Sequence, residues 1–294
     1  MNTLQSQPPT PRITFLEGRG DLPMLEITTR WSTAEISLHG AHVTHFKRHD
    51  EPPLLFLSQC SRFERTAPIR GGIPIIFPWF GKPADRPGQH GFARIRTWAL
   101  KEIHAPADGP VSVRLTLPPS ADLGEGKVNV EYLLHVDAAL TAELIVRNNS
   151  THPFTFENCL HTYFTVGDIH AVSVAGLQGV HYLDQPTGFT PRTETEAAIR
   201  FTGEVDRAYL NTRHAVEIRD PALGRSIRVE KTGSDSTVVW NPWSAKAKAM
   251  PDFGDDEYLR MVCVESGNVA DNRVTLAPGE RAALQIKLSS APLK

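Results

Sequence analysis

Three polar clusters in this sequence contain the side chains that could do chemistry. The first begins at Arg70, inside the apolar run 68–81, and continues into Gln89, His90 and Arg94. A guanidinium group offers a rigid fork of donors that suits a carboxylate or a phosphate. Two arginines close to a histidine and an amide therefore indicate a site for an anion or for sugar hydroxyls. Two alternatives stay open: a buried Arg70 paired with an internal acid, and a solvated loop around Gln89.

A pair of glycines, Gly71 and Gly72, follows Arg70 directly. Because glycine carries no side chain, the pair indicates that a ligand approaches the backbone closely at this point. Arg-Gly-Gly strings also occur in ordinary loops, so the glycines alone do not separate a ligand site from a structural turn.

The second cluster is the segment 157–164, in which His161 lies between Leu160 and Thr162. On a strand, the His161 side chain would project to the face opposite these two neighbours. Histidine has the unperturbed pKa nearest neutrality, which suits it to give and take protons. A single histidine among apolar neighbours is more often a hydrogen-bonded core residue, so His161 needs a partner before it indicates catalysis.

The third cluster offers that partner in the segment 261–267, which predicts a buried strand that ends in Glu265, followed by a turn at Ser266 and Gly267. Burial raises the pKa of a glutamate and makes it a better base than a solvated one. Alternatively, Glu265 caps the strand end or pairs with Arg70 or Arg94, and spacing alone does not choose between these roles.

The elements that must position these residues are predicted to be strands. Apolar and polar residues alternate over 35–38, 111–117 and 284–288, which is typical of half-buried antiparallel strands. Turn-forming glycine and proline pairs separate them, and the one helical candidate, 245–250, is a single turn. The sequence thus predicts an all-β protein with one large β-sandwich domain over 1–294, of which 1–11 form a flexible tail.

Composition excludes several classes of protein. With 31 basic and 33 acidic residues and a net charge of −2, the chain has no electrostatic footprint for nucleic acid or an anionic membrane. The N-terminal residues lack the pattern of a secretory signal, and no apolar run is long enough to span a membrane. The three widely spaced cysteines argue against a disulfide framework and a zinc ribbon. We expect a cytoplasmic protein.

Six motifs together resemble the hexose-6-phosphate mutarotases, or glucose-6-phosphate 1-epimerases, of the aldose 1-epimerase superfamily. The resemblance runs in order from about residue 12 to about residue 290. The motifs are Pro-Ile-Arg-Gly-Gly-Ile-Pro at 68–74, Phe-Pro-Trp-Phe-Gly at 77–81, His-Gly-Phe-Ala-Arg at 90–94, Leu-His-Thr-Tyr-Phe at 160–164, Val-Trp-Asn-Pro-Trp at 239–243 and Val-Cys-Val-Glu-Ser-Gly at 262–267.

The resemblance implies a galactose-mutarotase-like β-supersandwich of mainly antiparallel strands with few short helices. By their motifs, His161 and Glu265 match the catalytic histidine and carboxylate of the family. The resemblance also implies a substrate-binding set in which the arginines hold a sugar phosphate and the acid holds sugar hydroxyls: Arg70, Gln89, His90, Arg94 and Asp206. Without it, Asp206 would be interpreted as a turn or capping residue.

We therefore expect an isomerase that interconverts the α and β anomers of hexose 6-phosphates, chiefly glucose 6-phosphate. Glu265 would take the proton of the anomeric hydroxyl, and a protonated His161 would give one to the ring oxygen. Only protons move, so no cofactor or metal is expected, although the spacing of His39, His42 and His45 could suggest a metal cluster. By analogy we expect a monomer.

Two other functions remain open from the sequence. A mutarotase for free aldoses could use the same acid and base, but it would have little use for Arg70 and Arg94. A sugar-phosphate-binding β-sandwich without activity would keep the arginines, with Trp79, Phe80 and Trp243 as an aromatic floor.

Overall fold

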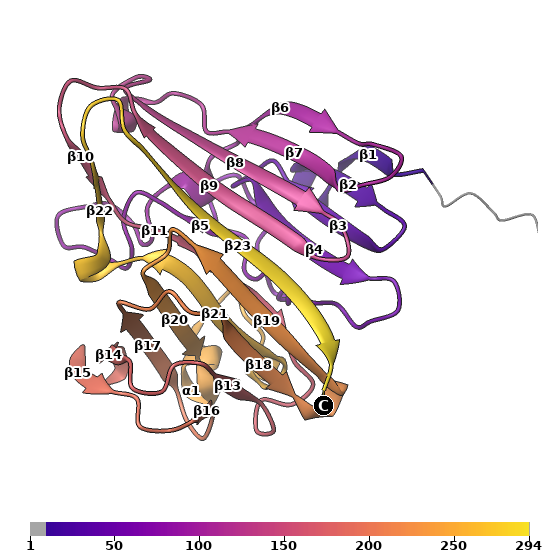
Figure 1. The fold of residues 1–294 in the computed structure, drawn as a ribbon, viewed down its shortest axis with the longest axis vertical. Helices are drawn as coiled ribbons and strands as arrows, with labels where there is room; N and C mark the ends of the chain where they lie inside the picture. Colours follow the sequence, from indigo (N-terminus) through magenta and orange to yellow (C-terminus); the bar gives the residue numbers. More distant parts are fainter. Residues whose placement is uncertain (1–9, 294) are drawn as a thin grey trace, which may run out of the picture.

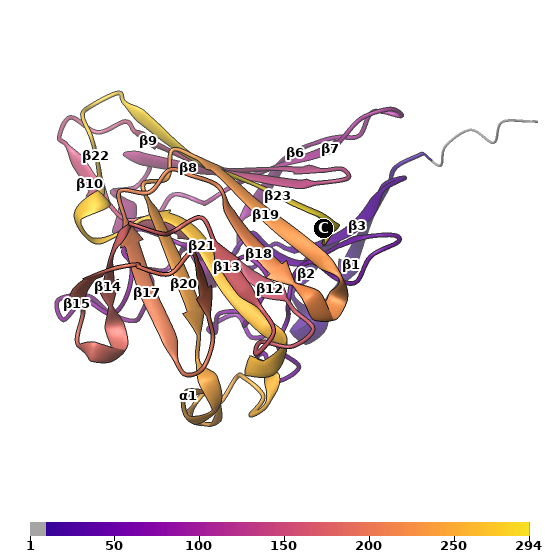
Figure 2. The same ribbon diagram turned by 60° about the horizontal axis from the view of Figure 1, so that its bottom comes forward.

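Antiparallel strands are the main regular structure of the protein. The structure, a computed structural model, describes residues 10–293. A nine-stranded sheet lies across an eight-stranded and a four-stranded sheet, and a two-stranded sheet stands at one end (Figures 1 and 2). Within the described residues α1 (Trp243–Ala249) is the single α-helix, and it packs outside the sheets. The predicted all-β class is confirmed.

The two large sheets combine consecutive strands with strands that lie far apart in the chain, whereas the four-stranded sheet contains four consecutive strands. Across the nine-stranded sheet the order is β16 (Ala198–Arg200), β13 (Ser173–Ala175), β18 (Val216–Asp220), β19 (Arg225–Thr232), β23 (Arg281–Pro292), β9 (Leu140–Asn148), β8 (Val128–Val136), β7 (Val111–Thr116) and β6 (Ala99–His104). Across the eight-stranded sheet it is β15 (Thr190–Thr193), β14 (His181–Asp184), β17 (Val205–Leu210), β20 (Ser236–Asn241), β21 (Met261–Asn268), β11 (Asn158–Leu160) and β5 (Ile75–Ile76), while β12 (Tyr163–Thr165) also pairs with β21. The smaller sheets contain β1 (Arg12–Glu17), β2 (Pro23–Thr28), β3 (Ser32–Ser37) and β4 (His42–Arg48), and β10 (Phe154–Phe156) with β22 (Val274–Leu276).

The main core lies between the large sheets. On β8, Val130, Tyr132 and Leu134 point inward while the residues between them are partly exposed. This alternation places every second side chain of a strand on the buried face, and burying each large apolar side chain stabilises the fold by roughly 1.5–3 kcal/mol. The core therefore extends continuously from the nine-stranded sheet to the sheets beneath it.

Strand β21 is buried on both faces. Val262 and Val264 point into the main core, whereas Cys263 and Glu265 point to the opposite face of the sheet. That opposite face is covered by loops and by α1, whose Ala247 packs in one cluster with Cys263, rather than by a second large sheet (Figure 2). A strand with one polar position inside an apolar run thus presents a carboxylate on the side away from the core.

The structure corrects one predicted boundary and refines others. The turn expected at Ser266 and Gly267 is wrong, because β21 continues to Asn268 and both residues pair with neighbouring strands. The alternating segments 35–38, 111–117 and 284–288 fall on β3, β7 and β23. Most of the tail expected over 1–11 lies outside the described residues, and β1 begins at Arg12.

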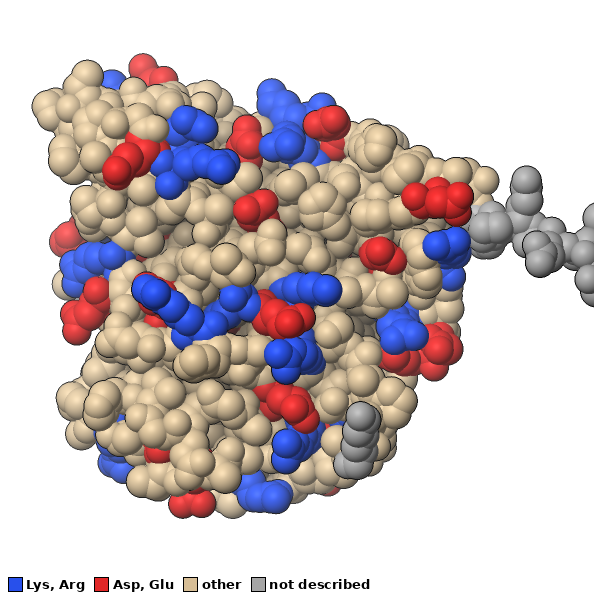
Figure 3. Space-filling view, viewed as in Figure 1, with Lys and Arg blue, Asp and Glu red and all other residues tan. Residues whose placement is uncertain are grey.

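Acidic and basic side chains are interspersed on the face that carries the nine-stranded sheet (Figure 3). Several are paired there, such as Arg228 with Glu230 at 3.3 Å and Arg114 with Glu131 at 3.0 Å. No helix in the described part of the chain has the length and apolar character that a membrane crossing requires.

Candidate active site

A row of residues across four adjacent strands forms the floor of the site. Asp206 on β17 pairs with Trp240 on β20, Trp240 pairs with Cys263 on β21, and Cys263 pairs with Tyr163 on β12. Directly paired residues in antiparallel strands share a face of the sheet. Glu265, two residues beyond Cys263, lies on the same face.

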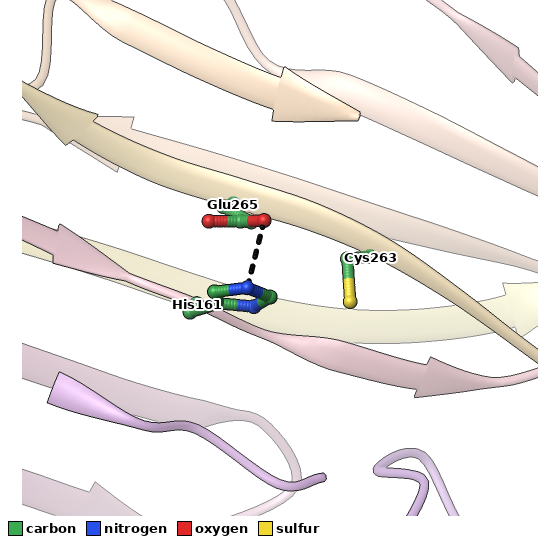
Figure 4. Close-up of side chains that lie close together, drawn as sticks. All are labelled: His161, Cys263 and Glu265. Atoms are coloured by element: carbon green, nitrogen blue, oxygen red, sulfur yellow. Dashed lines mark ion pairs between the residues drawn. The ribbon is translucent and has the colours of Figure 1, made fainter. Parts of the chain in front are cut away.

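His161 and Glu265 meet over this floor. His161 Nε2 lies 3.2 Å from Glu265 Oε1, and the side chains are 9% and 1% exposed (Figure 4). His161 does not lie on a strand; it lies in the connection between β11 and β12, where its backbone N–H donates to the carbonyl of Pro74 at 3.0 Å. The open question of a partner for Glu265 is thereby answered: it contacts His161 rather than an arginine.

Burial favours the neutral forms of both groups. It raises the pKa of Glu265 well above its ordinary value, and nearby Asp206 adds to this effect. The pKa of His161 falls well below its ordinary value because of burial and because His90, Arg94 and Arg70 carry or can carry positive charge. In the protein alone, the proton therefore rests on Glu265, contrary to the expectation that His161 starts protonated.

The second oxygen of Glu265 has its own partner. The Cys159 thiol, on β11, donates a hydrogen bond to Glu265 Oε2 at 3.4 Å. This contact favours the ionised carboxylate and partly opposes the effect of burial on the pKa of Glu265. The Cys159 thiol thus binds Oε2 of Glu265, while Oε1 faces His161.

Aromatic rings fix the plane of the His161 imidazole. The Tyr163 ring is nearly parallel to it, with centroids 4.8 Å and planes 11° apart. Trp240 and His90 meet it edge-on, at 6.0 Å and 5.8 Å. Trp243, which would join Trp79 and Phe80 in the aromatic floor of a sugar-phosphate-binding protein, packs against Tyr258.

Arg70 is held by two partners. Its guanidinium group donates to both carboxylate oxygens of Asp252, at 3.0 Å and 3.3 Å, and to the Tyr163 hydroxyl at 3.1 Å. Nε also donates to Asp252, so all three guanidinium nitrogens have a partner, and at least one of the five N–H groups has none. An internal acid therefore accompanies Arg70, and part of its fork remains available to a ligand.

Arg94 differs from Arg70 because it has no acid of its own. It lies in the 3₁₀ turn Ala93–Ile95, is 8% exposed, and donates one hydrogen bond to the carbonyl of Gln89 at 2.8 Å. It forms no ion pair with any residue in 10–293. Burial and Arg70 lower the pKa of Arg94 to about 10, which leaves it charged at neutral pH. A buried cation without a counter-ion indicates an anion-binding position.

Gln89 and His90 complete the arginine cluster. The amide of exposed Gln89 lies 3.0 Å from His90 Nε2, and His90 Nδ1 accepts from the backbone N–H of Gly81 at 3.1 Å. Burial, Arg94 and Arg70 lower the pKa of His90 well below its ordinary value, so its ring is neutral. His90 thus packs edge-on against His161 as a neutral ring and feels the charges of both arginines.

The glycine pair after Arg70 serves the fold rather than a ligand. Gly72 has φ +59°, and a Cβ there would lie 2.2 Å from the carbonyl oxygen of Val43. Gly71, at φ +116°, would meet Phe56 and Leu57 in the same way. The expected approach of a ligand to this backbone is therefore wrong, because the protein's own chain occupies the space.

Asp206 lies at the open side of the floor. Its side chain is 21% exposed and lies 3.5 Å from Lys246, which also binds Glu204 at 2.7 Å. Burial raises the pKa of Asp206 to about 6 in spite of Lys246. Asp206 is therefore largely ionised at neutral pH and can accept hydrogen bonds from hydroxyl groups.

The three histidines whose spacing could suggest a metal cluster do not converge. His39 and His42 donate to the backbone carbonyls of Ala67 and Gly71, at 2.8 Å and 2.7 Å. His45 lies 3.4 Å from the Thr33 hydroxyl. Burial lowers the pKa of His42 to about 3, so a neutral ring supports the loop that carries Arg70.

The structure thus brings His161, Glu265, Arg70, Arg94 and His90 together, with Gln89 at the edge and Asp206 on the floor. Sequence reasoning gave no role to Tyr163 and Trp240, although both stand inside motifs that it quoted. It missed Asp252 and Lys246 altogether. Asp252 is 182 residues from Arg70, and no local pattern links them.

Comparison with known proteins places the chain in a family. The model of the family described as aldose 1-epimerase matches residues 23–289. A protein of Cenchrus ciliaris, named "Putative glucose-6-phosphate 1-epimerase", is 39% identical over 270 residues, which are 88% of this chain and 82% of that protein.

Solved structures agree with the fold. A crystal structure titled as a "putative mutarotase" from Salmonella typhimurium has a TM-score of 0.87 and 29% identity, covering 99% of this chain and 96% of that one. A galactose mutarotase-like protein from Clostridium acetobutylicum has a TM-score of 0.70 at 15% identity, with 96% and 98% covered, and so shows the fold alone. The predicted galactose-mutarotase-like fold is confirmed. The chain belongs to the aldose 1-epimerase family.

Proposed function

We propose that the chain interconverts the α and β anomers of hexose 6-phosphates, chiefly glucose 6-phosphate, by acid–base opening and reclosure of the ring. The observation that carries this proposal is Arg94, a buried guanidinium group close to Arg70 that pairs with no acid in residues 10–293. A free aldose offers no anion to such a group, whereas a phosphate does. The name of the Cenchrus ciliaris relative supports the same substrate.

The acid and the base are His161 and Glu265. Their 3.2 Å contact allows the proton of Glu265 to pass to His161 without help from solvent. The resulting carboxylate takes the proton of the anomeric hydroxyl, and the imidazolium gives its proton to the ring oxygen. The bond between that oxygen and the anomeric carbon breaks, the aldehyde group rotates, and the same steps in reverse close the ring on the other face.

The phosphate has a part in this proton transfer. Positive charge on Arg70 and Arg94 opposes a further positive charge on His161. A bound phosphate neutralises the two guanidinium groups and so raises the pKa of His161. The phosphate then favours the imidazolium that donates to the ring oxygen, while Asp206 holds sugar hydroxyls on the floor.

The test measures anomer exchange by proton NMR saturation transfer, with glucose 6-phosphate and free glucose at equal concentration. Wild type should accelerate exchange of the phosphate far more than exchange of glucose, and Glu265→Gln should lose this acceleration. Arg94→Met should lower kcat/KM for the phosphate by roughly 10- to 150-fold, which corresponds to about 1.5–3 kcal/mol. Arg96→Met, which removes an arginine that is 53% exposed from the same segment, is the matched control.

Each other outcome identifies a different function. Equal acceleration of both sugars, with Arg94→Met affecting both alike, would mean a mutarotase for free aldoses. Binding of glucose 6-phosphate without exchange of either sugar would mean a sugar-phosphate-binding protein that keeps the fold without the chemistry.

A further inference from the structure

A third metal-ligating side chain lies beside the proposed acid and base. Cys263 stands two residues before Glu265 on β21, and both side chains lie on the face of the sheet that meets His161 (Figure 4). One ligand atom of each residue, the imidazole nitrogen, the thiol sulfur and a carboxylate oxygen, lies within 4.8 Å of the other two. All three side chains are buried. The acid–base chemistry proposed above makes no use of the thiol.

Nitrogen, sulfur and oxygen donors in this combination suit a soft divalent cation. A tetrahedral zinc ion, with bonds of roughly 2.0–2.3 Å, separates its donors by roughly 3.3–3.6 Å. His161 Nε2 and Glu265 Oε1 are already 3.2 Å apart. The sulfur must approach by about 1 Å, which rotation of the Cys263 and Glu265 side chains can supply.

We propose that His161, Cys263 and Glu265 form an inhibitory site for a soft divalent cation such as Zn²⁺ or Cd²⁺. The cation would take one ligand from each residue, displace the thiol and carboxyl protons, and leave a fourth position to water. The inhibition rests on the proposed function, because the cation occupies both proton-transfer groups. The binding site itself does not depend on that function.

The types of ligand atom, rather than the surrounding charges, set the selectivity for the cation. A dication with one thiolate and one carboxylate is neutral overall, so the nearby charges of Arg70 and Arg94 oppose it only weakly. Mg²⁺ takes oxygen ligands in octahedral geometry and has no such set here. The site therefore distinguishes thiol-seeking cations from hard ones.

The experiment uses the full chain carrying Cys60→Ser, which removes the exposed thiol, in buffer without chelators or thiol reductants. Cadmium–thiolate bonds give a charge-transfer absorption in the ultraviolet, and titration calorimetry gives the affinity for Zn²⁺. In the same protein, NMR exchange of glucose 6-phosphate is measured with Zn²⁺ and with Mg²⁺. Zn²⁺ should inhibit and Mg²⁺ should not.

Two matched variants show which thiol binds the cation. Cys263→Ala should lose the cadmium–thiolate band and weaken Zn²⁺ binding by about tenfold or more. Cys159→Ala removes the other buried thiol near Glu265, at the oxygen that faces away from His161, and should keep both the band and the affinity. Inhibition in each variant is compared with that variant's own rate without metal.

The proposal fails if the band survives in Cys263→Ala, or if Zn²⁺ binds no more tightly than Mg²⁺. A chain that exchanges neither sugar would overturn the proposed function, yet the cadmium band and the calorimetry would still decide the metal site. The two failures are therefore distinguishable.

Discussion

The imidazole of His161 stacks on the phenol ring of Tyr163, and the hydroxyl of that phenol accepts a hydrogen bond from Arg70 at 3.1 Å. One side chain thus packs against the proposed acid and orients part of the proposed phosphate site. The ring and the hydroxyl of Tyr163 have separate roles, and a single substitution can separate them.

Tyr163→Phe keeps the stacked ring and removes the hydroxyl. Because Arg70 then loses one of its orienting contacts, we expect kcat/KM for glucose 6-phosphate to fall by roughly fivefold, equivalent to about 1 kcal/mol. The slow exchange of free glucose should change little. NMR exchange rates for both sugars check this, and an equal loss for both would place the hydroxyl in the chemistry of the ring instead.

Arg94→Met should make the protein more stable while it lowers activity. The pKa of Arg94 falls on folding because of burial, and a base with a lowered pKa destabilises the fold at every pH below that value. Removing the charge should therefore raise the free energy of unfolding at pH 7 by on the order of 1–3 kcal/mol. Urea unfolding measures it, with Arg96→Met as the surface control.

Wild type and Arg94→Met also test whether Arg94 binds the anion. Inorganic phosphate should raise the melting temperature of wild type and should have little effect on Arg94→Met, since a ligand stabilises only the state that binds it. If phosphate stabilised both proteins equally, Arg94 would not be the anion-binding position.

An experiment that supplies the sugar and the anion as two separate molecules should show whether the phosphate affects the chemical step. Xylose lacks the carbon that carries the phosphate, and phosphite dianion can occupy the position left empty. If the anion offsets the charges of Arg70 and Arg94 that oppose an imidazolium, phosphite should accelerate exchange of xylose. NMR exchange at rising phosphite concentration measures the effect, and Arg94→Met should abolish it. If phosphite inhibited the exchange instead, the phosphate would contribute to binding only and not to the chemistry.

Sequence reasoning went furthest where a local pattern determines the structure. Alternating residues such as those of β7 and β8 predict strands because period two is the geometry of a half-buried strand. The same reasoning ended β21 too early at Ser266 and Gly267. A serine followed by a glycine is typical of a turn when only the sequence is considered, but here the strands on both sides pair with these residues.

The site was harder to predict from the sequence because its ion pairs and pKa values depend on contacts between distant segments. The bidentate pair of Arg70 and Asp252, and the absence of such a partner for Arg94 in the described residues, distinguish two arginines that look alike in the sequence. The neutral state preferred by His161 has the same origin, because burial and the two guanidinium charges come from separate segments. The residue types indicated acid–base chemistry and anion binding, but only the folded structure shows which arginine is paired and which form of His161 is favoured.

Asp206 offers a prediction in which stability depends on pH. Its pKa rises from 3.8 to about 6 on folding, so the folded state holds the proton more tightly than the unfolded chain. Stability is therefore highest below pH 3.8 and falls as pH rises through about 6, so that at higher pH wild type carries a penalty relative to a variant that stays neutral. Asp206→Asn stays neutral and should avoid that penalty.

Asp206→Asn should therefore unfold at a higher urea concentration than wild type at pH 8, by on the order of 1–3 kcal/mol, and this advantage should shrink at pH 4. Its kcat/KM should fall, because an amide oxygen binds sugar hydroxyls less strongly than a carboxylate does. Asp108→Asn, at a carboxylate that is 77% exposed, is the control and should show neither effect. An advantage of Asp206→Asn that is the same at both pH values would mean that the stabilisation comes from packing rather than from the removed charge.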